Sequence, residues 1–302
     1  MVKIFEKIWN EINKYERITI CTHITPDGDT IGSAIALKYL ILNNTNVKEV
    51  KISGDNHPKY LSFMEKPENV SDKYFDKSLK VVVDTSTKSR IWDKRVVTKN
   101  SIKIDHHHDE GEWMLGISGD LWPANGQIIS EMAESLKLEV PEISQEAIFV
   151  AIWTDTEGMK ERNPTKETWK ALERLTINKE DIIKKMELSD EKLSIFNNKL
   201  NEVIKNGKVS SIYVKETEIS EDDYRPLSGY INNKIKNYLF IFALERKNDI
   251  RIGLRSSEID VSVIANKYGG GGHKTSAGFI INNIKDFDMI LKEIEKEVNN
   301  VK

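Results

Sequence analysis

The sequence contains a single cysteine, Cys21, among its 302 residues. One thiol cannot form an internal disulfide, which suits a reducing compartment such as the cytoplasm. No stretch approaches the roughly eighteen apolar residues that a membrane-spanning helix needs, and the amino terminus lacks the apolar core of a signal peptide. We therefore expect a cytoplasmic protein without a membrane segment.

An excess of basic charge is also lacking. The formal net charge is -3, with 45 lysines and arginines against 48 aspartates and glutamates. Holding a long nucleic acid by electrostatics requires a broad basic surface, so that class of partner is not expected. Charged residues make up 31% of the chain and apolar residues 39%, which indicates a globular protein of about two domains.

The most unusual stretch is Asp105-His106-His107-His108-Asp109, which directly follows a predicted strand ending at Ile104. Aspartate and histidine are costly to bury without partners. Loops at the carboxyl ends of strands are where open α/β sheets bind ligands. We interpret the stretch as facing a metal ion, and the alternative is a solvated turn.

A second group of the same residue types follows a predicted strand at 17–22. His23, Asp27 and Asp29 lie on the turn into a helix expected from Ile31 to about Leu42. Three such groups at one strand end would repel each other unless a cation lay among them. A turn that caps the next helix would explain one aspartate but not the set.

Two further aspartates occupy similar positions. Asp84 directly follows a predicted strand at 79–83, and Asp155 lies in a polar turn after an apolar helix predicted at 143–153. A single aspartate at a strand end is commonly a helix cap. Because several predicted strand ends carry an aspartate or a histidine, we interpret these residues as one pattern and not as separate helix caps.

The composition shifts near residue 188, where a charged helix is predicted to extend to about Lys205. We place a first domain at 1–187, a helical linker at 188–206 and a second domain at 207–302. The second domain is predicted to contain strands at 209–214, 238–244, 250–254 and 277–281, and helices at 261–267 and 284–298.

A run of four glycines, 269–272, precedes His273 in the second domain. Glycine loses much conformational freedom on folding, so the run is expected where a backbone must approach a ligand closely. Backbone N–H groups could hold a phosphate or sugar, with Arg255 and Lys274 supplying positive charge. The alternative is a flexible turn. The candidate substrate-binding residues are Arg255, Gly270, Gly271, Gly272 and His273.

The order of these motifs resembles that of the DHH phosphoesterases, and the second domain is similar to their DHH-associated carboxyl-terminal domain. The group of nanoRNases that also act as pAp phosphatases is the most similar, with cyclic-dinucleotide phosphodiesterases as near relatives. The resemblance implies an α/β fold. It consists of an amino-terminal, mostly parallel sheet flanked by helices and a smaller α/β domain that binds substrate, joined by the helical linker.

The resemblance also implies two manganese ions, although other divalent metals could enter. One ion would be held by His23, Asp27 and Asp84, and the other by Asp29, Asp84, His106 and Asp155. Two ions about 3.5–4 Å apart can share a hydroxide that attacks phosphorus. The catalytic residues would be His107, facing the phosphate, and Asp105, orienting the histidines.

The implied substrates are short nucleotides: nanoRNA oligonucleotides, 3'-phosphoadenosine 5'-phosphate (pAp), or both. A cyclic di-AMP or pApA phosphodiesterase is the alternative, while the glycine–histidine loop argues against a related pyrophosphatase. A catalytically silent nucleotide-binding module is the non-enzyme alternative, but it should have lost metal ligands. The oligomeric state stays open, with a homodimer as one option.

Two segments depart from the pattern of that group. Residues 123–127 stand where it usually has serines and threonines, and residues 157–160 replace a glycine pair followed by an aromatic residue and an arginine. Both flank the expected active site, so they bear on the choice of substrate. His57 and His108 lie outside the pattern and are assigned no role.

Overall fold

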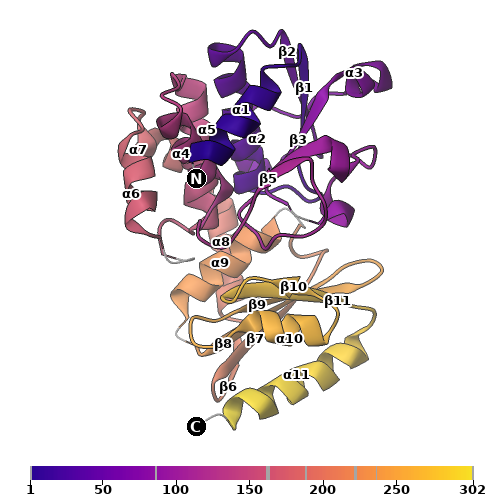
Figure 1. Ribbon diagram of the computed structural model, residues 1–302. Helices are drawn as coiled ribbons and strands as arrows, with labels where there is room; N and C mark the ends of the chain where they lie inside the picture. The colour runs from indigo at the N-terminus through magenta and orange to yellow at the C-terminus, as the bar shows by residue number, and fades with distance from the viewer. Residues whose placement is uncertain are drawn as a thin grey trace. The chain divides into compact units, whose positions relative to one another are not determined.

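A computed structural model describes residues 2–85, 87–160, 164–187, 189–220, 223–235 and 237–300. The chain divides into two compact units, Met1–Glu187 and Leu188–Lys302, and each has its own sheet (Figure 1). Within the described ranges, no helix has both the length and the apolar character needed to cross a membrane. The predicted α/β fold class is confirmed.

Unit 1 is built on a five-stranded, fully parallel sheet in the order β2-β1-β3-β4-β5. The strands are β1 Arg17–Cys21, β2 Glu49–Ser53, β3 Leu79–Val83, β4 Ser101–Ile104 and β5 Leu115–Ile117. Because β2 and β3 lie on opposite sides of β1, the strand order reverses there. In open sheets of this kind, ligands bind outside the carboxyl ends of the strands at that point.

Four helices cover one face of this sheet and share its main apolar core. They are α1 Val2–Ile12, α2 Gly28–Asn44, α4 Asn125–Ser135 and α5 Glu142–Asp155. A small residue near the start of α2 permits close packing, because a Cβ atom on Gly32 would lie only 2.4 Å from the Ala147 carbonyl oxygen of α5. This close contact holds α2 and α5 together in the layer of helices that covers this face of the sheet.

The other face of the sheet carries a smaller apolar cluster under α3, Asp72–Lys77, which includes Cys21 and Val82. Parallel strands buried on both faces are expected to be rich in apolar β-branched residues, as β3 is with Val81, Val82 and Val83. Short 3-10 turns connect the elements at η1 Lys59–Leu61, η2 Lys88–Arg90 and η3 Thr98–Asn100, and the outer helices are α6 Lys166–Glu173 and α7 Lys179–Met186.

Unit 2 contains a six-stranded mixed sheet in the order β10-β11-β9-β8-β7-β6, in which only β7 and β8 pair in parallel. The strands are β6 Ile204–Asn206, β7 Val209–Lys215, β8 Leu239–Glu245, β9 Ile250–Arg255, β10 Gly271–Gly272 and β11 Ser276–Ile281. Alternate residues of β8 enter two separate cores, so this sheet is covered on both faces.

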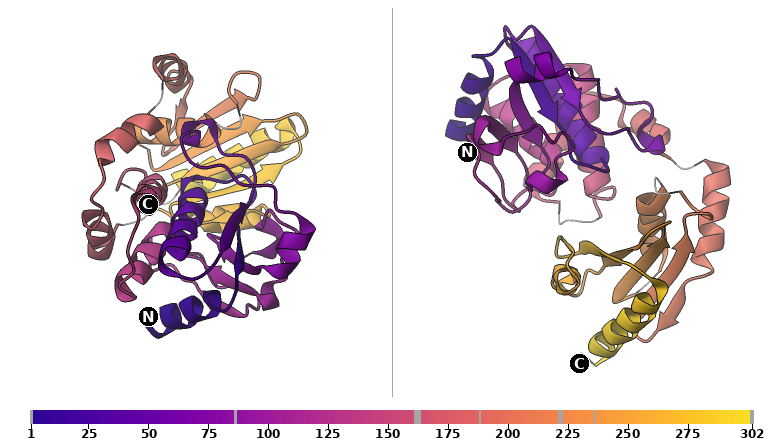
Figure 2. Two further views of the ribbon diagram at one scale, coloured as in Figure 1. Left: turned by 90° about the horizontal axis from the view of Figure 1, so that it is seen from above. Right: turned by 90° about the vertical axis from the view of Figure 1, so that its right-hand side faces the viewer.

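The helices of unit 2 lie on opposite faces of its sheet (Figure 2). Helices α10 Val261–Lys267 and α11 Ile284–Asn299 pack on one face, and α8 Asp190–Leu200 and α9 Tyr224–Lys234 pack on the other. The predicted helix at 261–267 has those limits in the structure. Helix α9 was not predicted, and Gly229 in its interior lowers its helix propensity.

The charged helix predicted to reach Lys205 ends at Leu200, and residues 204–206 form the edge strand β6 instead. Phe196 of α8 is buried in the core of unit 2 that also contains Phe240 and Phe242 of β8. The segment therefore contributes to the second unit, while its additional role as a linker stays a prediction.

Candidate metal centre

The first group of candidate ligands lies at the carboxyl end of β1. His23 follows the strand and is almost fully buried, and Asp27 caps α2 by accepting a hydrogen bond from the Thr30 N–H at 3.2 Å. The His23 Nε2 atom lies 3.6 Å from Asp27 Oδ1. Between them, Thr25 has a φ of 49°, an uncommon conformation for a β-branched residue. The turn is thus bent so that histidine and aspartate face each other.

Asp84 connects this group to the next one. It follows β3 directly and has a φ of 57°, a conformation that costs free energy and is concentrated at functional sites. Its two carboxylate oxygens face different histidines: Oδ2 lies 3.3 Å from His23 Nε2, and Oδ1 lies 3.2 Å from His106 Nε2. Asp84 therefore joins groups that come from the ends of β1 and β4.

The second group consists of Asp29, His106 and Asp155. His106 Nε2 lies 3.6 Å from Asp29 Oδ2 and 3.5 Å from Asp155 Oδ2. Asp29 is fully buried, and its oxygens accept hydrogen bonds from the backbone N–H groups of Asn125 and Gly126 at 2.6 and 2.9 Å. Asp155 is the last residue of α5, not part of a turn after it. Ligand-type atoms within each group lie within 4.8 Å of one another.

Backbone carbonyl groups orient both buried histidines. His23 Nδ1 lies 2.8 Å from the Ile24 carbonyl oxygen, and His106 Nδ1 lies 3.0 Å from the Trp122 carbonyl oxygen. A carbonyl oxygen accepts only, so each Nδ1 carries the proton and leaves the Nε2 lone pair toward the carboxylates in the neutral ring. This is the usual arrangement of histidines that bind metals through Nε2.

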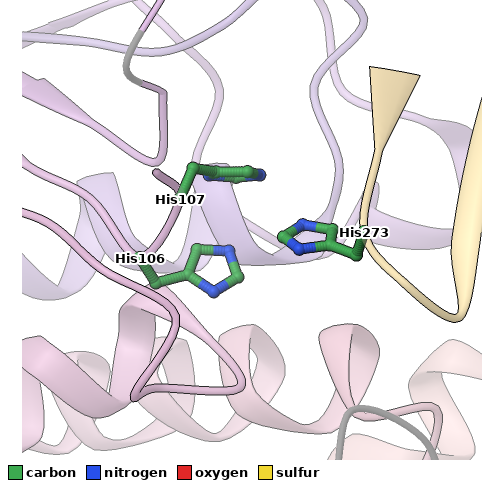
Figure 3. Close-up of side chains that lie close together, drawn as sticks. All are labelled: His106, His107 and His273. Atoms are coloured by element: carbon green, nitrogen blue, oxygen red, sulfur yellow. The ribbon is translucent and has the colours of Figure 1, made fainter. Parts of the chain in front are cut away.

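The remaining residues of the histidine stretch differ in their surroundings. His106 and His107 project from one loop with their ring centroids 4.4 Å apart (Figure 3). Asp105 is fully buried, and its Oδ1 lies 2.8 Å from His107 Nδ1, while His107 is only partly buried. His108 is 85% exposed and lies beside Asp120, so it is a surface residue.

The charges of the buried groups depend on each other. Burial lowers the pKa of both histidines, but the neighbouring carboxylates outweigh it and raise the pKa of His23 to about 9 and that of His106 to about 10. Burial, Asp84 and Asp155 raise the pKa of Asp29 well above its usual value. For Asp84, burial acts upward, but hydrogen bonds from His106 and His23 lower its pKa overall. The cluster needs positive charge, which protons or a cation can supply.

The substrate-binding candidates of unit 2 lie around a hairpin. Strand β10 pairs with β11, and the turn between them is closed by a hydrogen bond from the His273 N–H to the Ser276 carbonyl oxygen at 2.8 Å. Ser276 is also the register partner of Arg255, the last residue of β9. The structure thus brings Arg255 and His273 to the same end of the sheet.

The fold itself explains part of the glycine run. A Cβ atom on Gly270 would lie 2.1 Å from the Gly278 carbonyl oxygen, and one on Gly272 would lie 2.5 Å from the Ala277 Cα. Close packing within the hairpin is therefore sufficient to require glycine at these two positions, and their assignment to a substrate site stays a prediction. At Gly271 the nearest atom would be Asn266 Oδ1 at 3.7 Å, so the fold leaves room for a side chain there.

Sequence comparison matches both halves of the chain to known domains. Residues 17–146 match the DHH family, N-terminal domain, and residues 206–300 match the DHHA1 domain. The chain contains a DHH domain and a DHHA1 domain. The DHH match contains all the candidate ligands except Asp155, and the DHHA1 match contains the whole glycine hairpin.

Similar proteins extend over nearly the whole chain. A bifunctional oligoribonuclease and PAP phosphatase NrnA of Mycoplasma genitalium is 29% identical, with 96% of each chain covered. The protein of the same name from Bacillus subtilis is 27% identical, over 94% of this chain and 95% of its own. An exopolyphosphatase-related protein from Bacteroides fragilis has a similar fold, with a TM-score of 0.83 at 20% identity, covering 99% of this chain and 97% of that one.

The sequence analysis did not identify two parts of this DHH domain as contributors to the site. The first is the segment 123–127, which forms the start of α4 and supplies the backbone N–H groups that hold Asp29. The second is the Trp122 carbonyl group, which orients His106. The departure of 123–127 from the usual composition was the only available signal, and it marked the position without indicating the contact.

The segment 157–160 forms the turn that ends α5. Glu157, Gly158 and Met159 have φ values of 47°, 70° and 68°. Three successive left-handed residues reverse the chain immediately after Asp155. The turn therefore limits where the carboxylate of Asp155 can lie, although the segment differs from the sequence usual in this group.

Proposed function

We propose that this chain is a divalent-metal-dependent phosphoesterase that hydrolyses short nucleotides, either nanoRNA oligonucleotides, pAp, or both. The observation that carries the proposal is the position of Asp84. Its two oxygens face histidines of two different ligand groups at 3.3 and 3.2 Å, as expected of a carboxylate that bridges two metal ions.

The donor atoms fit a pair of divalent cations. They are imidazole nitrogens and carboxylate oxygens without a thiolate, a set that suits manganese and similar ions. His23, Asp27 and Asp84 would hold one ion, and Asp29, Asp84, His106 and Asp155 the other. When bound, two such ions would polarise the phosphoryl oxygens and lower the pKa of water. The crowding of buried carboxylates supports this assignment, because the protein alone disfavours the charge on Asp29.

His107 and Asp105 would then position the phosphate. Asp105 accepts a hydrogen bond from His107 Nδ1 at 2.8 Å, which fixes the orientation of the ring. A histidine held in this way can donate a hydrogen bond from Nε2 to a phosphate oxygen in its protonated form. Asp105 is fully buried and would act through His107, not on the substrate.

The choice of substrate is supported by the relatives and by unit 2. The similar proteins of M. genitalium and B. subtilis are named as oligoribonucleases and PAP phosphatases. Arg255 can form bidentate hydrogen bonds to a phosphate. Gly271, like Gly269, has free space where a Cβ atom would lie, which suits a ligand that approaches the hairpin. His273 would complete this recognition site with Gly270 and Gly272, whose small size shapes the hairpin.

A substrate panel tests the proposal. The protein is stripped with chelator and assayed with manganese or magnesium on pAp, pApA, cyclic di-AMP, RNA oligonucleotides of two to five nucleotides, and pyrophosphate. We expect no turnover without metal, recovery with manganese, and preference for pAp or short RNA. Preference for cyclic di-AMP or pyrophosphate would overturn the substrate, and full turnover after metal removal would overturn the metal dependence.

A further inference from the structure

Asn125, the first residue of α4, has an unusual environment. Its side chain is fully buried, and among the described residues neither Oδ1 nor Nδ2 has a hydrogen-bond partner. More than about 90% of buried polar groups in proteins have a partner, because leaving one unpaired costs free energy. A carboxamide with both ends unsatisfied therefore points to a group that binds there.

The position of Asn125 is fixed by the proposed metal ligands. Its backbone N–H donates to Asp29 Oδ2 at 2.6 Å. Three residues earlier, the Trp122 carbonyl oxygen lies 3.0 Å from His106 Nδ1. Asp29 and His106 belong to the same group, with Asp155, and are as completely buried as Asn125 itself. The backbone that carries the buried carboxamide is thus held next to this half of the cluster.

The neighbouring residues of α4 point elsewhere and are fully packed or paired. A Cβ atom on Gly126 would lie 2.4 Å from the Ala151 Cβ atom, so that side of α4 rests on α5. Gln127 has the same amide group, but its Oε1 accepts from Thr168 and its Nε2 donates to Glu131, both at 2.7 Å. Successive helical residues are rotated by about 100°, so Asn125 does not share these partners.

We propose that the Asn125 carboxamide is a further group of the metal site, on the side of Asp29, His106 and Asp155. Oδ1 is an oxygen donor to the coordination shell of that ion, and Nδ2 donates a hydrogen bond to an acceptor in the same shell. An amide oxygen is a hard ligand that suits manganese, magnesium and calcium. The inference rests on the proposed metal dependence, and it gives the atypical segment 123–127 a function in this chain.

The test compares metal binding with the stability of the metal-free protein. Asn125→Ala removes the carboxamide, and Asn125→Leu removes it while keeping its approximate volume. Gln127→Ala is the matched control, because it deletes an amide from the same helix whose partners lie within the protein. Each variant is stripped with chelator, its melting temperature is measured, and manganese binding is followed by calorimetric titration.

We expect both Asn125 variants to bind one of the two manganese ions, the one beside Asp29, His106 and Asp155, about tenfold to a hundredfold less tightly. Losses of this size are found when groups around a metal are removed. The melting temperature of the metal-free protein should be unchanged or higher for Asn125→Leu, since no hydrogen bond within the protein is lost. Gln127→Ala should lower that temperature and leave manganese affinity within about twofold of the wild type.

Unchanged manganese affinity in both Asn125 variants would overturn the inference, as would a fall in the metal-free melting temperature of Asn125→Leu as large as that of Gln127→Ala. Failure of the wild type to bind manganese would instead overturn the proposed function. The two failures are distinguishable because the wild-type titration is independent of Asn125.

Discussion

The two units present their candidate residues in opposite ways. In unit 1, side chains of aspartate and histidine are buried at the carboxyl edge of a parallel sheet and lie 3.2–3.6 Å from one another. In unit 2, the candidates are the exposed backbone of a glycine hairpin and one arginine at a strand end. The first arrangement suits cation binding and catalysis, and the second suits recognition of a substrate.

This difference has a physical origin in the two sheets. Parallel strands all end at one edge, so residues that follow β1, β3 and β4 meet there from distant parts of the sequence. In a hairpin of antiparallel strands, neighbouring residues meet along the ladder, and glycine permits the close approach seen between β10 and β11. Mutations should therefore act on turnover in unit 1 and on substrate affinity in unit 2.

The largest effect is expected from Asp84→Asn. The substitution removes the charge of the residue that joins the two ligand groups, so a metal that contributes several kcal/mol to transition-state stabilisation would be lost. We expect kcat to fall by about a thousandfold or more with every substrate. Steady-state kinetics and metal analysis of the purified variant measure both effects.

Asp55→Asn is a matched control for this experiment. Asp55 also follows a strand of the same sheet, β2, but it belongs to neither ligand group. Among the described residues, its side chain accepts a hydrogen bond only from the adjacent Asn56 N–H. Its turnover and metal content should equal those of the wild type. Near-normal kcat in Asp84→Asn, with its metal retained, would show that unit 1 does not depend on a bridging carboxylate.

The next effect separates the two units. Arg255→Ala removes a phosphate donor, and a charge-assisted hydrogen bond is worth about 1.5–3 kcal/mol. We expect kcat/KM to fall about tenfold to a hundredfold for pAp and short RNA, with metal content unchanged. A small diester such as bis-nitrophenyl phosphate has no distal nucleotide, so its hydrolysis should change little.

Arg251→Ala serves as the control, since Arg251 lies on the same strand and stacks on the Tyr224 ring at 4.5 Å. It should leave the nucleotide kinetics unchanged. Equal losses of nucleotide and small-ester hydrolysis in Arg255→Ala would remove the distinction between chemistry in unit 1 and recognition in unit 2.

A smaller effect is expected from Gly271→Ala. The added methyl group fits without collision inside unit 2, but it would obstruct a ligand that approaches the backbone. Losing one neutral hydrogen bond corresponds to a rise in KM of up to about tenfold, with the melting temperature unchanged.

Gly270→Ala provides the contrast, because its methyl group collides with the Gly278 carbonyl group at 2.1 Å. It should destabilise the protein by about 1–3 kcal/mol in urea unfolding. If Gly271→Ala changes neither KM nor stability, the hairpin has no ligand at that glycine.

Much of the site could be predicted because its residues follow predictable elements. The limits of strands β1 and β3 were set by apolar β-branched runs, so His23 and Asp84 could be placed at strand ends before the fold was known. The pairing of specific atoms could not be predicted from the sequence. Asp29 is held by N–H groups 96 and 97 residues away, and only the packed fold brings them together.

The missed helix has a similar cause. Helix α9 contains Gly229, which lowers its helix propensity, yet Leu227 and Ile231 are fully buried in a core of unit 2. Tertiary burial outweighed propensity there. The packing requirement for glycine at Gly270 and Gly272 could not be predicted either, because the sequence does not show how closely the hairpin backbone approaches β11.

The smallest effect concerns pH and compares two aspartates of unit 1. Asp93, like Asp29, is buried, and burial acts to raise its pKa, but hydrogen bonds from Arg95 and Ser53 reverse this and lower the pKa below its usual value. A lowered pKa in the folded state stabilises the protein above the unfolded value of about 3.9, and this contribution is lost as pH falls through the folded pKa.

Asp93→Asn should therefore be less stable than the wild type near pH 7, and the difference should shrink below about pH 4. Urea unfolding of both proteins in chelator, from pH 7 downward, measures it. Parallel stability curves for the two proteins would contradict the assignment. The opposite shift at Asp29 marks the difference between a carboxylate whose charge the protein stabilises and one whose charge the protein alone disfavours.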